Sequence, residues 1–423
     1  MNSRSGCLIL AAAWLSAGAA GAAPVTISQP FMNLENRGIN SLGFTPGEFM
    51  RVGATSVIPN GSAGTSGVAS TVNLVTGAIE TRSLVFNPAP VIPNFFVRNL
   101  PDSPALYGPW TLNFSNGADT RQSTVTLPAG TTQAPFVNTI TLSGTSAVPV
   151  FTWAPPPGAL VNAYRINIYD RSLVTATSSG QVSSRTVAPS QTSYTVDGAD
   201  FTVPGYAFQL GRNYSIEIGL IRTKDGGSTD FGNSDIAAIS RVYADFRASD
   251  SGGPVVNLPV TRVDGSFQFN FAVTPGQTYF IDPVVAVGYD YRIGAGNPSF
   301  ASVVLPAGIG DGRYDIFGLG AGGGATLLAD DWAGGSVFSF AGAGVDAFRV
   351  TGIEASAALD PADVTAFVTG LTFSGSGLFT GTQTPITLDV AAVPEPETYA
   401  LMLLGLGCVG WRLRRRASPL PTR

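Results

Sequence analysis

Histidine is absent from this chain of 423 residues. It is the side chain most often used as a general base near neutral pH, and it is the commonest metal ligand. Its absence excludes Ser-His-Asp and Cys-His catalysis as well as histidine-ligated zinc. No phosphate-binding loop, zinc motif or dinucleotide fingerprint is present, so we expect no cofactor.

Cysteine and charge are also scarce. The two cysteines, Cys7 and Cys408, lie in apolar segments near opposite ends of the chain. If both segments are removed or membrane-bound, the folded part has no disulfide and must be stabilised by packing. Charged residues make up 12% of the chain, and the formal net charge is −5. This acidic balance argues against nucleic acid and anionic membrane surfaces as partners.

The residues that are plentiful indicate an all-β protein. The chain has 51 glycines and 30 prolines, and its hydrophobic content of 44% is sufficient for real cores. Valine, threonine and phenylalanine are common, as expected for strands joined by Gly/Pro turns. The length allows two to four domains. We predict about three β-sandwich-like domains between two terminal segments.

The N-terminus has the layout of a secretory signal peptide over residues 1–22. Arg4 precedes the apolar run of residues 7–15, and small residues follow. Ala20-Gly21-Ala22 fits an A-x-A cleavage site, so we predict cleavage after Ala22. A buried N-terminal helix is the alternative.

The C-terminus, residues 393–416, has three parts in order. Pro394, Glu395 and Pro396 come first and cannot continue a helix backward. Residues 399–411 carry no charge, and as a helix they would span ~20 Å, which is short against a hydrocarbon core of about 30 Å. A basic cluster follows that would lie on the cytoplasmic side, namely Arg412, Arg414, Arg415 and Arg416. We therefore predict that residues 399–411 form a transmembrane segment that anchors the protein only temporarily.

This order of motifs resembles the PEP-CTERM sorting domain, which occurs on exported bacterial proteins, often ones linked to exopolysaccharide. The resemblance implies that an exosortase, a membrane-embedded processing enzyme, recognises the tail and removes it near the Pro394–Pro396 motif. It covers about 25 residues. An ordinary weak single-pass anchor is the alternative.

Residues 23–136 are predicted to form the first β-sandwich-like domain. Trp110, Leu112 and Phe114 alternate with polar residues, as in a half-buried strand. Residues 137–248 resemble a fibronectin type III domain. Trp153 matches that family's early-strand tryptophan, and Tyr214 matches its corner tyrosine, whose hydroxyl bonds to the upstream backbone. The Pro-Gly usual in that turn is absent.

Residues 248–254 are predicted to be a linker, and residues 255–390 a third, Gly/aromatic-rich β domain. Phe267, Phe269 and Phe271 alternate and should share one strand face. Parts of this domain resemble a segment found upstream of the same sorting tail in other proteins. That resemblance implies a position in the chain, and no activity.

Paired carboxylates are the first candidate for chemistry, because glycoside hydrolysis uses two of them. Asp330 and Asp331 stand beside Trp332, with Glu354 or Asp346 as a further partner. Neighbouring residues on a strand point to opposite faces, so this pair should not itself form the dyad. A solvated turn is the alternative.

Calcium is the second candidate, because oxygen-rich loops with glycine suit this ion. One such loop carries Asp225, Asp230, Asn233 and Asp235, and another carries Asp311 and Asp315. Neither has the EF-hand spacing. Ordinary hairpin tips are the alternative.

Carbohydrate binding is the third candidate, through aromatic rings that could stack on sugars if exposed. The rings considered are Tyr289, Tyr291, Tyr314 and Trp332. Core packing is the alternative, since Tyr289 and Tyr291 would share a strand face. The glycine-rich residues 318–325 are predicted to be a turn.

These features favour a non-enzymatic exported protein of the cell surface or extracellular matrix, structural or adhesive and associated with exopolysaccharide. It would contact the membrane through its tail before processing. A carbohydrate-binding module or a polysaccharide-active enzyme is the alternative.

Overall fold

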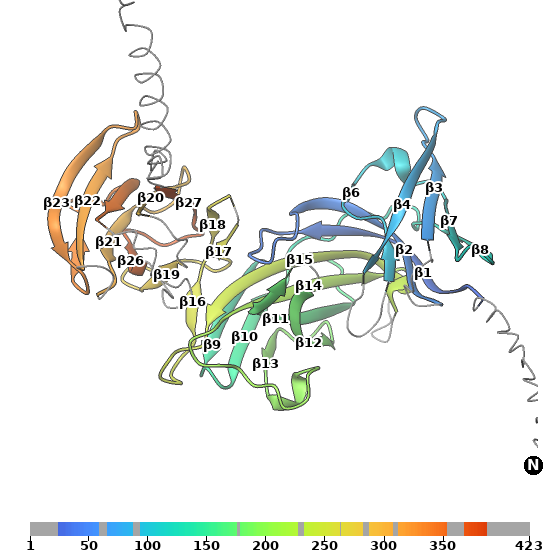
Figure 1. Cartoon of the computed structure of the whole chain (residues 1–423), viewed down its shortest axis with the longest axis horizontal. Coiled ribbons are helices and arrows are strands. Elements are labelled where there is room, and N and C mark those ends of the chain that lie inside the picture. Colours follow the sequence, from blue (N-terminus) through green and yellow to red (C-terminus); the bar gives the residue numbers. More distant parts are fainter. Residues whose placement is uncertain are drawn as a thin grey trace, which may run out of the picture.

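The computed structural model describes residues 24–58, 66–87, 94–175, 178–226, 232–262, 264–281, 287–307, 312–352 and 368–386. In these ranges the chain forms strands and three short 3-10 turns (Pro104–Leu106, Gly198–Asp200 and Asn233–Asp235), with no α-helix. The predicted all-β class is confirmed (Figure 1). The strands form two regions, residues 24–258 and residues 260–386, each with its own large hydrophobic cluster.

The first strands build one sheet that curls on itself. Its order is β1-β2-β5-β4-β3-β7-β8, and the far strand β8 returns to lie against β1. Trp110, Leu112 and Phe114 point into the curl and are fully buried, as their alternation predicted. The strands are β1 (Thr26–Arg37), β2 (Gly47–Ile58), β3 (Ser66–Val72), β4 (Ile79–Asn87), β5 (Asn94–Phe96), β6 (Leu100–Pro101), β7 (Trp110–Ser115) and β8 (Thr120–Val125).

The next strands form two sheets that face each other. Three strands in the order β13-β10-β9 pack against four in the order β12-β11-β14-β15. The strands are β9 (Thr139–Gly144), β10 (Pro149–Ala154), β11 (Ala163–Thr175), β12 (Ser178–Val187), β13 (Ser193–Thr195), β14 (Asn213–Thr223), β15 (Ile236–Arg247) and β16 (Val256–Leu258). This seven-stranded sandwich agrees with the fibronectin type III resemblance.

Two predicted details of that sandwich are present. Trp153 on β10 is 3% exposed and packs edge-on against Tyr164, with ring centroids 5.2 Å apart. The backbone N–H of Gln209 donates to the Tyr214 hydroxyl at 2.7 Å. This bond fixes the chain before β14, as a tyrosine corner does.

A single sheet joins the first two predicted units. β1 pairs in parallel with β15, with Leu34 opposite Ala238, so that strands from both units form a sheet of 13 strands. One hydrophobic cluster runs through both. The sheet therefore continues across the predicted boundary at residue 136.

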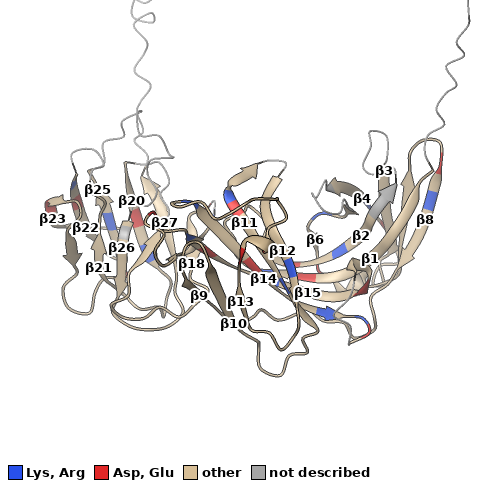
Figure 2. Cartoon of the chain, turned by 90° about the horizontal axis from the view of Figure 1, so that it is seen from below, with Lys and Arg blue, Asp and Glu red and all other residues tan. Residues whose placement is uncertain are grey.

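The second face of this sheet, the one opposite the hydrophobic cluster, carries buried charged residues. Glu35 on β1 is 2% exposed and lies within ion-pair distance of Arg37 (2.7 Å), Arg51 (3.1 Å) and Arg241 (3.0 Å). Arg241 also pairs with Glu217 on β14. Figure 2 shows charged positions along the long strands of this sheet. We call these five residues the ionic cluster.

Residues 260–386 form a second sandwich. A sheet in the order β17-β18-β27-β20-β25-β22-β23 packs against one in the order β19-β26-β21-β24. The strands are β17 (Val260–Thr261), β18 (Ser266–Gln268), β19 (Tyr279–Ile281), β20 (Gly288–Ile293), β21 (Phe300–Val304), β22 (Arg313–Leu319), β23 (Ala325–Ala333), β24 (Val337–Ser339), β25 (Ala347–Thr351), β26 (Val368–Phe373) and β27 (Thr380–Ile386). Phe267, Phe269 and Phe271 are all buried in its core, as predicted.

A second tyrosine corner, which was not predicted from the sequence, lies in this region. The N–H of Thr274 donates to the Tyr279 hydroxyl at 2.8 Å. Pro275 and Gly276 form the intervening turn, with Gly276 at φ +77°. The Pro-Gly pair before a tyrosine was the signal that could have revealed it.

Candidate functional site

The proposed sugar-stacking surface is wrong for three of its four rings. Tyr289, Tyr291 and Tyr314 are at most 1% exposed and belong to the core of the C-terminal region. They sit at inward positions of β20 and β22, and the outward positions next to them are polar or charged, namely Asp290, Arg292, Arg313 and Asp315. Trp332 alone is half-buried; its ring packs edge-on against Phe338, with centroids 5.2 Å apart. Packing was therefore the correct alternative for the tyrosines.

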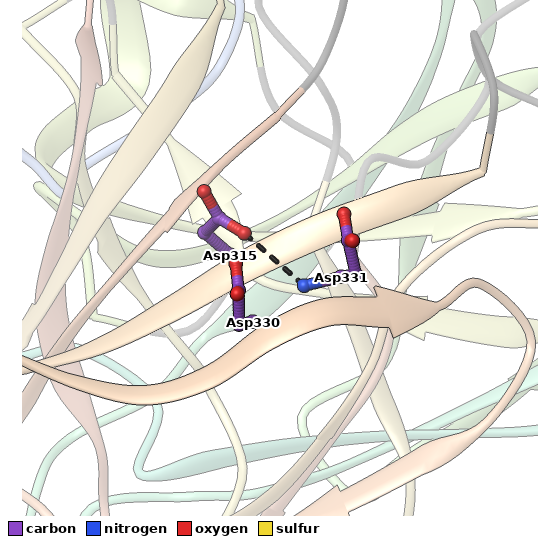
Figure 3. A group of neighbouring side chains, drawn as sticks. All are labelled: Asp315, Asp330 and Asp331. Carbon is purple, nitrogen blue, oxygen red and sulfur yellow. Dashed lines mark hydrogen bonds between the residues drawn. The ribbon is translucent and has the colours of Figure 1, made fainter.

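The structure does bring together the carboxylates of Asp315, Asp330 and Asp331 (Figure 3). One carboxylate oxygen from each lies within 4.8 Å of the others. Asp315 comes from β22, and the other two come from the neighbouring edge strand β23. The expectation that strand alternation separates Asp330 from Asp331 is therefore wrong.

A β-bulge explains this geometry. Tyr314 is opposite Trp332 and Ile316 is opposite Ala329, so β23 contains one more residue than β22 over this step. Asp331 takes a left-handed backbone conformation, with φ +50°, which aspartate tolerates better than most residues. Two residues on the bulged strand then oppose one on its partner. The N–H of Asp331 donates to Asp315 Oδ1 at 3.2 Å.

The three carboxylates repel one another. A hydrogen bond with Asp315 raises the pKa of Asp330, and the charges of Asp315 and Asp331 raise it further. Such a group can share a proton or supply part of the oxygen shell of a hard cation such as Ca²⁺. Asp315 is half-buried, whereas Asp330 and Asp331 are exposed.

The further partners suggested for this pair do not join it. Asp346 accepts a hydrogen bond from Ser299 Oγ at 2.7 Å and is not part of the three-carboxylate group. Glu354 and Asp311 lie outside the described residues. Within the glycine-rich residues 318–325, which were predicted to be a turn, residues 320–324 form the turn between β22 and β23, closed by a Gly320 N–H to Gly324 carbonyl bond of 2.9 Å.

The other proposed calcium loop is organised by its own hydrogen bonds. The Asp235 carboxylate accepts from the Gly232 N–H at 2.9 Å, and Asn233 Nδ2 donates to Thr55 Oγ1 at 3.2 Å. Burial lowers the pKa of Lys224, which lies close to Asp235. Asp230 lies outside the described residues, so calcium binding by Asp225, Asp230 and Asp235 stays a prediction.

The proposed signals at the two ends also lie outside the described residues. These are cleavage at Ala22, the Pro394–Pro396 motif, the segment 399–411 and the basic cluster. Within the described residues, no helix has the length and apolarity needed to span a membrane.

Comparisons with known proteins match the C-terminal segment to a family. Residues 392–416 match the family model of the PEP-CTERM protein-sorting motif. No curated protein sequence matches the chain. Among solved structures, the FN1–FN3 domains of chicken CNTN1 are similar over 54% of this chain and 69% of that one, with 10% identity and a TM-score of 0.21.

A segment of titin is similar over 50% of this chain and 63% of its own length, with 11% identity and a TM-score of 0.17. These two scores are too low to carry an argument, so the description of the fold rests on the strand order and the tyrosine corner. The sorting motif, a signal for exosortase-type processing, implies an exported protein that is sorted through its C-terminal segment.

Proposed function

We propose that this chain is a non-enzymatic structural or adhesive protein of the cell surface or extracellular matrix, associated with extracellular polysaccharide. The observation that carries the proposal is the sorting motif at residues 392–416, which follows two β regions with extensive buried cores. Antiparallel sandwiches hold their shape by packing alone, which suits a protein without a disulfide in its folded part.

The tail would act in three steps. Pro394, Glu395 and Pro396 would present an extended recognition site at the membrane surface. Residues 399–411 would hold the chain there briefly, because the segment is short for a lasting anchor. The four arginines would fix the orientation. Cleavage after Ala22 and removal of the tail would release residues 23–393.

Deletion of residues 394–423 tests the sorting step. The deleted protein should lose its processing shift in size and change its distribution between membrane and medium. A variant with Pro394, Glu395 and Pro396 changed to alanine is the matched comparison, because it keeps the apolar segment and the arginines. It should stay membrane-bound at its unprocessed size. Unchanged size and location in both variants would reject the proposal.

A carbohydrate-binding or polysaccharide-active protein is the second candidate. The carboxylate group beside the half-buried Trp332 is the observation that favours it. A glycan array and a reducing-sugar assay would separate the cases. Binding without turnover indicates a module, turnover indicates an enzyme, and neither result leaves the structural role.

A further inference from the structure

A cavity of about 490 Å³ opens beside the turn that joins β22 and β23. It lies where the ends of β20 and β22 meet the beginnings of β23 and β25. Its volume is in the range of small-molecule sites, but the pocket is open to solvent rather than enclosed. The polar groups around it come from Arg292, Thr326 and Asp346, and Leu319 and Val345 contribute apolar surface.

Arg292 is the first notable group in this cavity. It lies on β20 opposite Ala347, is half-buried, and has no ion pair in the described part of the chain. Its neighbour Arg349 gives the contrast, because Asp290 binds that guanidinium at both ends, at 2.6 and 3.0 Å. The same sheet thus holds one arginine that a carboxylate neutralises and one, Arg292, that lines the cavity and forms no ion pair among the described residues.

Asp346 supplies an acceptor at the same site. Its Oδ1 accepts from Ser299 at 2.7 Å, whereas no described side chain donates to Oδ2. The turn adds peptide groups, since Gly320 and Ala321 line the cavity. The cavity therefore offers a guanidinium, a carboxylate oxygen and a hydroxyl group beside apolar side chains.

We propose that this cavity binds a hydroxylated carboxylate of about monosaccharide size, such as a sugar acid. Arg292 pairs with the ligand carboxylate through two parallel N–H···O bonds, the geometry that guanidinium favours. Asp346 accepts a hydrogen bond from a ligand hydroxyl. The C–H face of the ring packs on Leu319 and Val345. A sugar acid would make the polysaccharide association proposed above more specific. The inference rests on that proposed function only for where the ligand comes from.

Titration calorimetry on the purified full-length chain tests the site, with glucuronate, glucose and acetate as probes. We expect saturable binding of glucuronate with a dissociation constant below about 1 mM, and at least about tenfold weaker binding of glucose and of acetate. Polygalacturonate distinguishes the source, because binding of the polymer indicates residues within a chain and binding of the monomer alone indicates a free or terminal sugar acid.

Three substitutions in the cavity and one control outside it locate the binding. Arg292→Gln should weaken glucuronate binding at least about tenfold, and Arg292→Lys should restore only part of it. Ala347→Leu should block the cavity without changing its charge. Arg98→Gln, which removes an exposed arginine in the other region, should leave affinity unchanged and is the matched control.

Equal binding of glucose and glucuronate, or unchanged affinity in Arg292→Gln, would overturn the assignment. Loss of binding in Arg98→Gln would overturn it too. Thermal unfolding of each variant separates loss of the site from loss of the fold. Because the experiment uses purified protein, its outcome is independent of the sorting test.

Discussion

The two regions of the molecule place their charges differently. In residues 24–258, Glu35 and Glu217 are buried on the second face of the long sheet. In residues 260–386, Asp290 and Arg349 lie on the outer sheet face, 16% and 36% exposed, and the core consists largely of aromatic rings. Strand alternation sorts residues onto two faces in both regions. It does not say whether the second face meets water.

The segment between β1 and β2 covers the second face of the 13-stranded sheet and accounts for this difference in burial. Phe44, between β1 and β2, packs on Tyr169 and Tyr243, with ring centroids 6.2 and 6.4 Å away. These tyrosines flank Glu217, whose Oε2 accepts from Tyr169 at 2.8 Å. The second face of the long sheet is thus enclosed as well, and its carboxylates must be neutralised by arginines. Because Glu35 and Arg241 come from different predicted units, their pairing also links β1 to β15.

Removing Glu35 should give the largest effect. Glu35→Gln leaves Arg37, Arg51 and Arg241 without their shared carboxylate, so we expect a loss of about 3–5 kcal/mol in the free energy of unfolding. Urea denaturation followed by tryptophan fluorescence measures it. Glu80→Gln is the control, because Glu80 and Arg82 form an ion pair that is 28% and 44% exposed. Its loss should be under about 1 kcal/mol.

The pH dependence sharpens the same test. Burial would raise the pKa of Glu35, but the charges of Arg241, Arg51 and Arg37 overcome it and lower the pKa from 4.5 to about 2. A carboxyl group with a depressed folded-state pKa stabilises the protein above its unfolded-state value. Its contribution should be lost as the pH falls from 4.5 toward 2, and Glu35→Gln should remove that slope. Equal slopes in the two proteins would contradict the role given to the ionic cluster.

The two tyrosine corners allow a matched comparison of the regions. Tyr214→Phe and Tyr279→Phe each remove one hydroxyl that accepts a backbone N–H. We expect each to cost about 1 kcal/mol, with Tyr214→Phe the more harmful. Burial raises the pKa of Tyr214, and its hydroxyl also interacts with Tyr206, whose own hydroxyl donates to Asp170 at 2.6 Å.

Calorimetry should show each substitution lowering the unfolding transition of its own region. If both substitutions shift a single shared transition, the two regions unfold as one unit. The two regions would then differ in how their residues pack and not in how they unfold.

Local patterns were sufficient to predict much of the fold. The buried faces of residues 110–114 and 267–271 and the bond to Tyr214 follow from alternation and one motif. The ionic cluster could not be predicted, because its members come from four strands and meet only through the parallel pairing of β1 with β15. The sequence named Asp315, Asp330 and Asp331 as candidates, but it did not predict that they meet, because alternation fails at a bulge and no glycine marks its left-handed residue, Asp331.

That carboxylate group should give the smallest effect and the opposite sign from Glu35. The raised pKa of Asp330 means that the folded protein holds its proton more tightly than the unfolded chain, so the ionised group disfavours folding above its usual pKa. Asp330→Asn should therefore slightly raise the thermal midpoint at pH 7, and the gain should vanish as the pH falls through the raised pKa.

Asp264→Asn is the control of opposite sign, because hydrogen bonds from Ser266 lower the pKa of Asp264. The repulsion is tolerable because β23 is an edge strand, with Leu327 50% and Leu328 43% exposed. A bulge and like charges on such an edge discourage pairing with another chain. The opposite result would be a lower thermal midpoint in Asp330→Asn and a higher thermal midpoint in the wild-type protein when Ca²⁺ is added. That result would show that a cation holds the three carboxylates together.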